Sequence, residues 1–385
     1  MCVRPIQIPN PSRVPNPREW LINHPLERRK DLTSAYIRVP CGHCVECVRL
    51  QQNYWIQRFR LMASVSDMYY QTLTLKPSMT PHLNLTFENG DTFDKEVVTR
   101  DMLQKYFKRI RKDNVFGTQF KYFAVSEYGG KRHRPHFHIV YFVPKTNDPL
   151  AVKVGRGNRL KWELFDYWSR NDGTRKNPVY VPYCEYHEKH VGSKIFRNYD
   201  FHYIVPSATQ NGTSDVGFYV SKYILKFSDY VDNVIHLFWH NLNPDDLSNA
   251  IYSFRPFLLC SKDFGSVTPD KWKADFTEFN RIIDVCKQKS LTSCRDGTNK
   301  FDSFLFYTPD GKAFPLSPLL RKKYIRGDDV LQMFDTQRVR HFDEYMNDYD
   351  ASRYDNLDYD RLSNSAREED KLRKHIESIN DLWQF

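Results

Sequence analysis

The stretch Arg134-Pro-His-Phe-His-Ile-Val-Tyr-Phe142 decides the fold of this chain and points to its chemistry. Phe137 and Ile139 alternate in it with His136 and His138, a period of two that predicts a β-strand. Successive side chains on a strand point to opposite faces, so the two histidines share one face, about two residue rises apart. That spacing allows both imidazoles to bind one divalent cation.

A second stretch, Tyr219-Val-Ser-Lys-Tyr-Ile-Leu-Lys226, predicts a helix with Tyr219 and Tyr223 one turn apart on one face. Lys222 and Lys226 flank the two tyrosines. Tyrosines at helical spacing are usually core aromatics, but a core face would not carry interleaved lysines. A metal site combined with paired tyrosines and lysines is suited to cutting phosphodiester bonds, provided that the fold brings them together.

The combination of His-hydrophobic-His on a strand with Tyr-x-x-Lys-Tyr on a later helix resembles the HUH endonucleases. Within these enzymes the chain is similar to the replication initiator proteins of microviruses, which are small phages with circular single-stranded DNA. The paired-tyrosine form Tyr219-Val-Ser-Lys-Tyr223 is the more specific part of the match. The resemblance covers roughly the first 230 of the 385 residues, and the remainder is interpreted from composition alone.

The resemblance implies site-specific nicking of a phage replication origin, which starts rolling-circle replication. Tyr219 and Tyr223 would be the nucleophiles, Lys222 would assist them, and the product would be a 5′-phosphotyrosine with a free 3′ hydroxyl. A magnesium or manganese ion would polarise the scissile phosphate. The partners expected are single-stranded DNA at the viral origin and the host helicase and polymerase.

Glu127 is the expected third ligand of the metal. It ends a predicted strand over Phe120–Glu127, which Gly129 and Gly130 connect to the histidine strand, so it would lie near His136. A carboxylate suits a hard cation such as magnesium or manganese, and the resemblance implies a glutamate at this place. Alone, the His-x-His pair would more often be two polar residues on a solvated sheet face. Glu127 and the tyrosine stretch together favour the metal site.

Basic residues supply the candidate DNA contacts. The formal net charge is +10 and the pI about 9.0, which suits a polyanion partner, although such a charge can also serve solubility alone. The stretch Arg100–Lys112 predicts an amphipathic helix with a dense basic side, and a basic loop precedes the histidine strand. The candidate DNA-binding residues are Lys105, Lys108, Arg109, Arg111, Lys112, Lys131, Arg132, Arg134 and Lys226.

Three cysteines recur at a three-residue step in Cys41-Gly-His-Cys-Val-Glu-Cys47. Two thiolates at this spacing form a usual half-site for zinc. Cys2 is the first candidate for the fourth ligand and His43 the second, and an initial Met-Cys with such a cluster is similar to one branch of the microvirus initiators. The alternative is a helix-capping turn with reduced cysteines. A zinc ion held by Cys2, Cys41, Cys44 and Cys47 would be structural.

The order of elements predicts an α+β fold with a mostly antiparallel central sheet, helices on one face and the histidines on the other. The resemblance implies a ferredoxin-like, RNA-recognition-like core. Further strands are expected over 69–75 and 201–205, and helices over 48–66 and 160–168. The expected organisation is an N-terminal arm with the cysteine cluster over 1–47, the endonuclease domain over 48–230, and a helical region of unassigned role over 231–385.

No window approaches the roughly 18 uncharged apolar residues of a membrane span. The amino terminus lacks the apolar run of a secretory signal, so we expect a protein of the bacterial host's cytoplasm with mostly reduced cysteines. Two other functions stay open at this stage. A metal nuclease that uses water would form no covalent adduct with DNA, and a non-catalytic single-strand-binding protein would bind without cutting.

Overall fold

The computed structural model describes residues 6–9, 36–39, 45–130, 132–205, 229–299, 303–308 and 311–333. The chain divides into two compact units, one of Met1–Tyr54 with Met333–Phe385, and one of Trp55–Gln332. In the first unit, β1 (Ile6–Pro9) pairs antiparallel with β2 (Tyr36–Val39). The second unit holds the central sheet and everything described below.

The central sheet has five antiparallel strands in the order β12-β3-β7-β6-β13. Their bounds are Ser66–Thr74 for β3, Lys121–Tyr128 for β6, Pro135–Pro144 for β7, Asp200–Tyr203 for β12 and Leu258–Cys260 for β13. The first four, with the helices α4 (Arg100–Lys112) and α5 (Leu150–Tyr167), follow the chain order β-α-β-β-α-β of a ferredoxin-like fold. The predicted α+β class and antiparallel sheet are confirmed.

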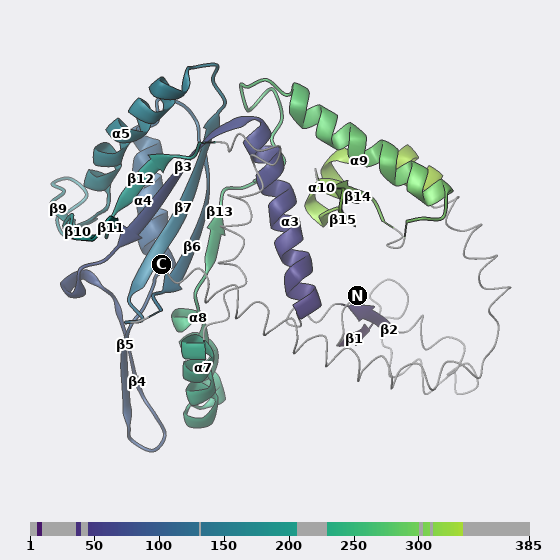
Figure 1. Ribbon diagram of the computed structural model, residues 1–385. Helices are drawn as coiled ribbons and strands as arrows, with labels where there is room; N and C mark the ends of the chain where they lie inside the picture. The colour runs from purple at the N-terminus through teal and green to yellow at the C-terminus, as the bar shows by residue number, and fades with distance from the viewer. Residues whose placement is uncertain are drawn as a thin grey trace, which may run out of the picture. The chain divides into compact units, whose positions relative to one another are not determined.

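One face of the sheet is covered by α4 and α5 (Figure 1). The alternation of β7 places Phe137, Ile139 and Tyr141 on this face, where they join the main hydrophobic core. Helix α4 contributes Leu103 and Phe107 to this core from its buried side, as the amphipathic pattern predicted. Burial of each such side chain stabilises the fold by roughly 2 kcal/mol.

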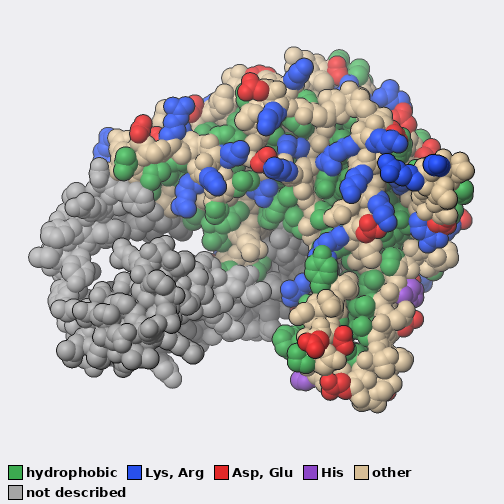
Figure 2. Space-filling view, turned by 180° about the vertical axis from the view of Figure 1, so that it is seen from behind, with side chains coloured by type: hydrophobic (Ala, Val, Ile, Leu, Met, Phe, Trp, Pro, Cys, Tyr) green, Lys and Arg blue, Asp and Glu red, His purple; other side chains and the backbone are tan. Residues whose placement is uncertain are grey.

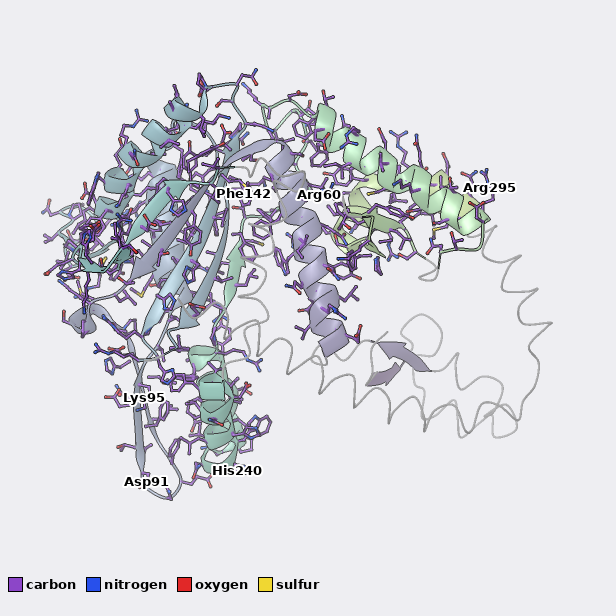
Figure 3. The ribbon with its side chains drawn as sticks, viewed as in Figure 1. Arg60, Asp91, Lys95, Phe142, His240 and Arg295 are labelled. Carbon is purple, nitrogen blue, oxygen red and sulfur yellow. The ribbon has the colours of Figure 1, made fainter. Side chains whose placement is uncertain are left out.

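The opposite face is shared by a helix and the two histidines. Helix α3 (Val45–Ser64) places Phe59 against Phe123 of β6 and Phe142 of β7, with ring centroids 4.7 and 5.6 Å apart. Toward the other end of the same face, His136 and His138 are left clear of this helix (Figure 3). The expectation that helices cover only the face away from the histidines therefore needs a correction, because aromatic packing brings α3 onto part of the histidine face.

The compact unit continues past the boundary expected at residue 230. Strand β13 pairs with β6, and α7 (Asp229–Asn241) and α8 (Pro244–Phe254) bury Phe238 and Phe254 in the main core. Further along are α9 (Thr277–Arg295), the hairpin of β14 (Leu305–Tyr307) with β15 (Ala313–Pro315), and α10 (Pro318–Tyr324). The helical character expected for this region is confirmed in its described residues.

Three smaller hairpins lie at the margins of the sheet. The hairpin of β4 (His82–Thr86) and β5 (Thr92–Glu96) projects from one end, with Asp91 at its tip (Figure 3). The other two pair β8 (Ser169–Asn171) with β9 (Tyr180–Pro182) and β10 (Glu188–Val191) with β11 (Lys194–Arg197). His187 and His190 thus belong to an exposed strand region rather than to a helix face. No helix in the described ranges combines the length and apolarity that a membrane crossing requires.

Candidate metal centre

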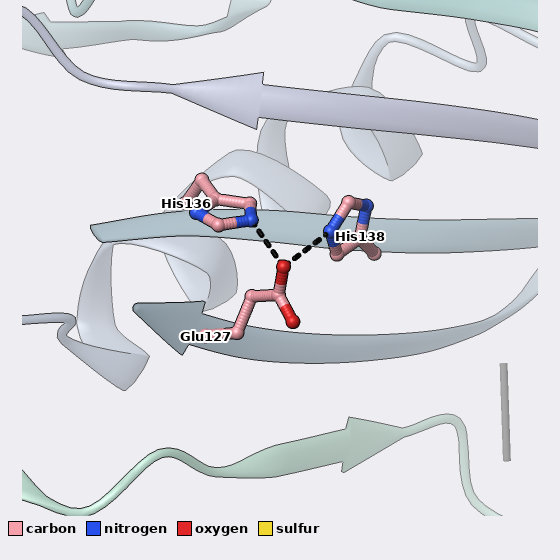
Figure 4. A group of neighbouring side chains, drawn as sticks. All are labelled: Glu127, His136 and His138. Atoms are coloured by element: carbon pink, nitrogen blue, oxygen red, sulfur yellow. Dashed lines mark hydrogen bonds and ion pairs between the residues drawn. The ribbon is translucent and has the colours of Figure 1, made fainter. Parts of the chain in front are cut away.

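Strand pairing brings Glu127, His136 and His138 together on the open part of the sheet face (Figure 4). Glu127 of β6 lies directly opposite His136 of β7, and His138 follows two residues later on the same side. Oε1 of Glu127 is 2.5 Å from Nε2 of His136 and 3.1 Å from Nε2 of His138. All three side chains expected from the sequence to bind the metal therefore converge on one point.

The outer nitrogens of both imidazoles are occupied by partners. Nδ1 of His136 lies 3.1 Å from the carbonyl oxygen of Arg134. Because a carbonyl only accepts hydrogen bonds, Nδ1 carries the hydrogen and Nε2 can offer its lone pair to a cation. Nδ1 of His138 is hydrogen-bonded to the hydroxyl of Tyr70, and the hydroxyl of Thr72 lies 3.5 Å from the same nitrogen. Both rings thus direct Nε2 toward Glu127.

The three side chains are largely enclosed but not sealed. The exposed fractions are 17% for His136, 12% for Glu127 and 9% for His138. Burial acts to raise the pKa of Glu127, but the hydrogen bonds from His136 and His138 and their positive charge outweigh it and hold that pKa far below its usual range. Glu127 is therefore a carboxylate at any physiological pH, as a metal ligand must be.

The donor set fits a divalent cation. Two imidazole nitrogens and one carboxylate oxygen lie within 4.8 Å of one another, and within the described ranges no other three such groups do so. Imidazole with carboxylate suits manganese and related ions, and the exposed side leaves positions for phosphate oxygens or water. The prediction of a divalent metal site at Glu127, His136 and His138 is supported by this geometry, which does not distinguish magnesium from manganese.

Two residues of this centre were missed from the sequence, Tyr70 and Thr72. Both lie on β3, the strand next to β7, and Thr72 is directly opposite His138. The alternation of β3 places them on the histidine face, but only the register between two strands about 60 residues apart in the chain reveals that they meet His138. Their sequence neighbours gave no such signal.

The basic helix α4 lies on the other side of the sheet from this centre. Its Arg109 hydrogen-bonds to the carbonyl oxygens of Tyr167 and Ser169, the latter at 2.6 Å. Arg111 bonds to Oγ of Ser261 at 3.2 Å and lies over the rings of Phe120 and Tyr122. The assignment of Arg109 and Arg111 as DNA contacts is therefore corrected: both guanidinium groups hold the fold together.

Lys105, Lys108 and Lys112 are exposed on α4, as expected. In the loop before β7, Arg132 is exposed and Arg134 donates a hydrogen bond of 2.8 Å to the carbonyl oxygen of Leu75. Cys47 is buried near the start of α3. The other candidate residues lie outside the described ranges: Tyr219, Lys222, Tyr223, Lys226, Lys131, Cys2, Cys41, Cys44 and His43.

Comparison with known proteins places this centre in a family. The family model of the replication-associated protein ORF2 matches residues 69–228, a range that includes the metal cluster and the paired tyrosines. The chain is 30% identical over 146 residues to the replication-associated protein ORF2 of Spiroplasma virus 4, covering 37% of this chain and 44% of that protein.

It is also 26% identical over 158 residues to the replication-associated protein ORF4 of Chlamydia phage 1, covering 37% of this chain and 36% of that protein. The chain thus matches less than half the length of each of these relatives. No solved structure matches it. These matches confirm the resemblance drawn from the sequence: over residues 69–228 the chain is a relative of the phage replication-associated proteins of the ORF2 family.

Proposed function

We propose that the protein acts in phage replication as an endonuclease and ligase for single-stranded DNA, which nicks the viral origin and so starts rolling-circle replication. The observation that carries this proposal is the convergence of Glu127, His136 and His138 on the open part of a sheet face. The relatives, which bear the name of replication-associated proteins, support the wider role.

The described chain on both sides of the tyrosine stretch supports the proposal that Tyr219 and Tyr223 reach this centre. Residue 230 is fixed near the metal end of the sheet, where the ring of Tyr230 stacks on His133 with centroids 3.8 Å apart. Tyr223 precedes Tyr230 by seven residues, so its Cα can be at most about 25 Å away, whatever its conformation. For Tyr219 the corresponding limit is about 40 Å.

At the upstream end, the backbone N–H of Ile204 donates to the carbonyl oxygen of Met68, and Met68 lies opposite Phe142, far from His136. The chain between residues 205 and 229 must therefore pass from one end of the sheet to the other. The tyrosines belong to the part of this connection that is nearer in sequence to the metal end.

In the reaction proposed, a tyrosine hydroxyl loses its proton and attacks the scissile phosphorus. The new bond joins the tyrosine oxygen to the 5′ phosphate, and the bond between phosphorus and the 3′ oxygen breaks. The 3′ oxygen takes up a proton and leaves as a free hydroxyl, which a host polymerase extends. When bound, a divalent ion supplies Lewis-acid polarisation of the phosphate oxygens.

The residues of this chain would divide the remaining work. Glu127, His136 and His138 orient the phosphate through the ion that they bind, and Lys222 stabilises negative charge on the phenolate or the phosphate. Because the phosphotyrosine conserves the energy of the broken bond, attack by a 3′ hydroxyl reverses the step and rejoins the strand without ATP. With two tyrosines, a second cut is possible while the first remains joined to DNA.

Incubation with single-stranded origin DNA and manganese tests this function. The label belongs at the 3′ end of the DNA, because the fragment with the 5′ phosphate is the one that becomes attached. We expect a labelled band near the mass of the protein that a chelator abolishes. Cleavage without that band would instead indicate a nuclease that uses water, and binding without cleavage a non-catalytic single-strand-binding protein.

A further inference from the structure

Most of the net positive charge of the chain lies in two segments, residues 100–113 and 150–182. Together they contain 13 lysines and arginines and five aspartates and glutamates, a net charge of +8 out of the +10 of the whole chain. These segments form α4, α5 and the hairpin of β8 and β9. The charge is therefore concentrated on the side of the sheet that faces away from the metal centre.

Some of these cations have structural partners and others do not. Lys153 is buried against Asp67 at 2.6 Å, and Arg156 pairs with Asp148 at 2.6 Å. By contrast, Lys108, Lys112 and Lys176 are exposed, and none of them has an ion pair within the described part of the chain. In the view from behind, lysine and arginine side chains gather over this side of the molecule (Figure 2). Such cations are available to phosphate groups.

An exposed aromatic ring lies among them. The side chain of Tyr180 on β9 is 51% exposed, and the guanidinium carbon of Arg109 is 4.9 Å from its ring centroid. Arg109 is itself fixed by its hydrogen bonds to Ser169, with 2.6 Å to the carbonyl oxygen and 3.1 Å to Oγ. The ring is therefore supported by a cation that cannot easily move, which limits the ordering cost of stacking a base on it.

Lys105 and Arg170 connect the helix to the hairpin. Both lie close enough to Tyr183 for their positive charges to favour its ionised form, as does Arg109. The basic side of α4 and the β8–β9 hairpin thus form one continuous surface, which we call the rear surface. Cations that follow a backbone, combined with an exposed ring, are the pattern by which proteins bind single strands without reading sequence.

We propose that the rear surface binds single-stranded nucleic acid, with Lys105, Lys108 and Lys112 on phosphates and Tyr180 stacked on a base. Because the sheet separates it from the metal centre, this surface would hold a part of the strand remote from the point of cleavage. A purely double-stranded partner would use the lysines but not Tyr180, since paired bases offer no free face. The proposal does not depend on cleavage.

Binding of a fluorescent oligothymidylate to the full-length protein, in chelator so that no cleavage occurs, tests it. Substitution of Lys105, Lys108 and Lys112 by Gln should weaken binding at least about tenfold and reduce the slope of log affinity against log salt by about 2. The matched control replaces Arg321, Lys322 and Lys323, three exposed cations on α10, by Gln. This control should bind as wild type does.

Tyr180→Ala should weaken binding about tenfold without changing the salt slope, because stacking releases no counterions. Wild-type affinity in the α4 triple variant, or an equal loss in the α10 control, would overturn the proposal. Wild-type affinity in Tyr180→Ala would overturn the stacking on a single strand and leave phosphate contacts alone. Loss of binding in a variant that still forms the covalent adduct at saturating DNA would separate this surface from the cleavage chemistry.

Discussion

The hydroxyl of Tyr70 on β3 is hydrogen-bonded to Nδ1 of His138 on the neighbouring strand β7. Their rings are nearly parallel, with an interplanar angle of 23° and centroids 5.8 Å apart. If Nδ1–H donates to the phenol oxygen, Nε2 of His138 offers its lone pair toward Glu127. Tyr70 is thus a positioning residue, which acts on the metal through His138.

Replacement of Tyr70 by Phe should weaken manganese binding about 10- to 100-fold, since the outer hydrogen bond fixes the tautomer and the ring orientation. Titration calorimetry with manganese, without DNA, measures this directly. The matched control is Tyr69→Phe, which removes the hydroxyl of the adjacent tyrosine on the opposite sheet face. An unchanged manganese affinity in Tyr70→Phe would remove Tyr70 from this role.

Arg109 should prove structural. Arg109→Met removes charged hydrogen bonds from α4 to the carbonyl oxygens of Tyr167 and Ser169, and should lower the free energy of unfolding by about 2 kcal/mol. The neighbouring Lys108→Met should change it by less than about 0.5 kcal/mol, because Lys108 is exposed. Urea unfolding of the two variants compares them. Equal stabilities would return Arg109 to the candidate DNA contacts.

The elements with strong periodicity could be predicted from the sequence. The bounds of α4 agree with the predicted stretch because its apolar residues recur at helical spacing and basic residues cover the other side. The position of Glu127 opposite His136 also followed, since a short connection between two strands fixes their register. Local signals were sufficient in both cases.

What could not be predicted depends on contacts between distant segments. An exposed position on a helix does not reveal that the side chain of Arg109 extends to the end of α5 and bonds there. Nor does the short run Leu258–Cys260 announce a fifth strand, because its partner β6 lies far earlier in the chain. Tyr70 was missed for the same reason.

Loss of the metal ligands should separate chemistry from binding. His136→Ala, His138→Ala and Glu127→Ala should each abolish cleavage, while affinity for single-stranded DNA in chelator stays close to wild type. The reason is that affinity comes mainly from contacts of lysine and arginine with phosphates. Gel assays of cleavage and anisotropy assays of binding measure the two effects. Full nicking by the double histidine variant in chelator would contradict the metal assignment.

The cysteine cluster should hold about one structural zinc ion per chain, with Cys41, Cys44 and Cys47 as ligands and Cys2 as the expected fourth. Elemental analysis of the purified protein measures it. Cys41→Ser with Cys44→Ser should lose the zinc and stability but keep the cleavage chemistry, because four thiolates leave no position for a substrate. A protein without zinc, whose native thiols all titrate freely, would refute this site.

The covalent adduct measured in tyrosine variants tests the central claim most directly. With 3′-labelled origin DNA and manganese, Tyr219→Phe and Tyr223→Phe should each still form some adduct on a simple nicking substrate, because either hydroxyl can attack. The double variant should form none, although it still binds DNA. If the double variant formed the adduct at the wild-type level, neither tyrosine would be the nucleophile. If Tyr219→Phe alone removed all adduct while Tyr223→Phe behaved as wild type through termination, the claim of two alternating nucleophiles would be wrong.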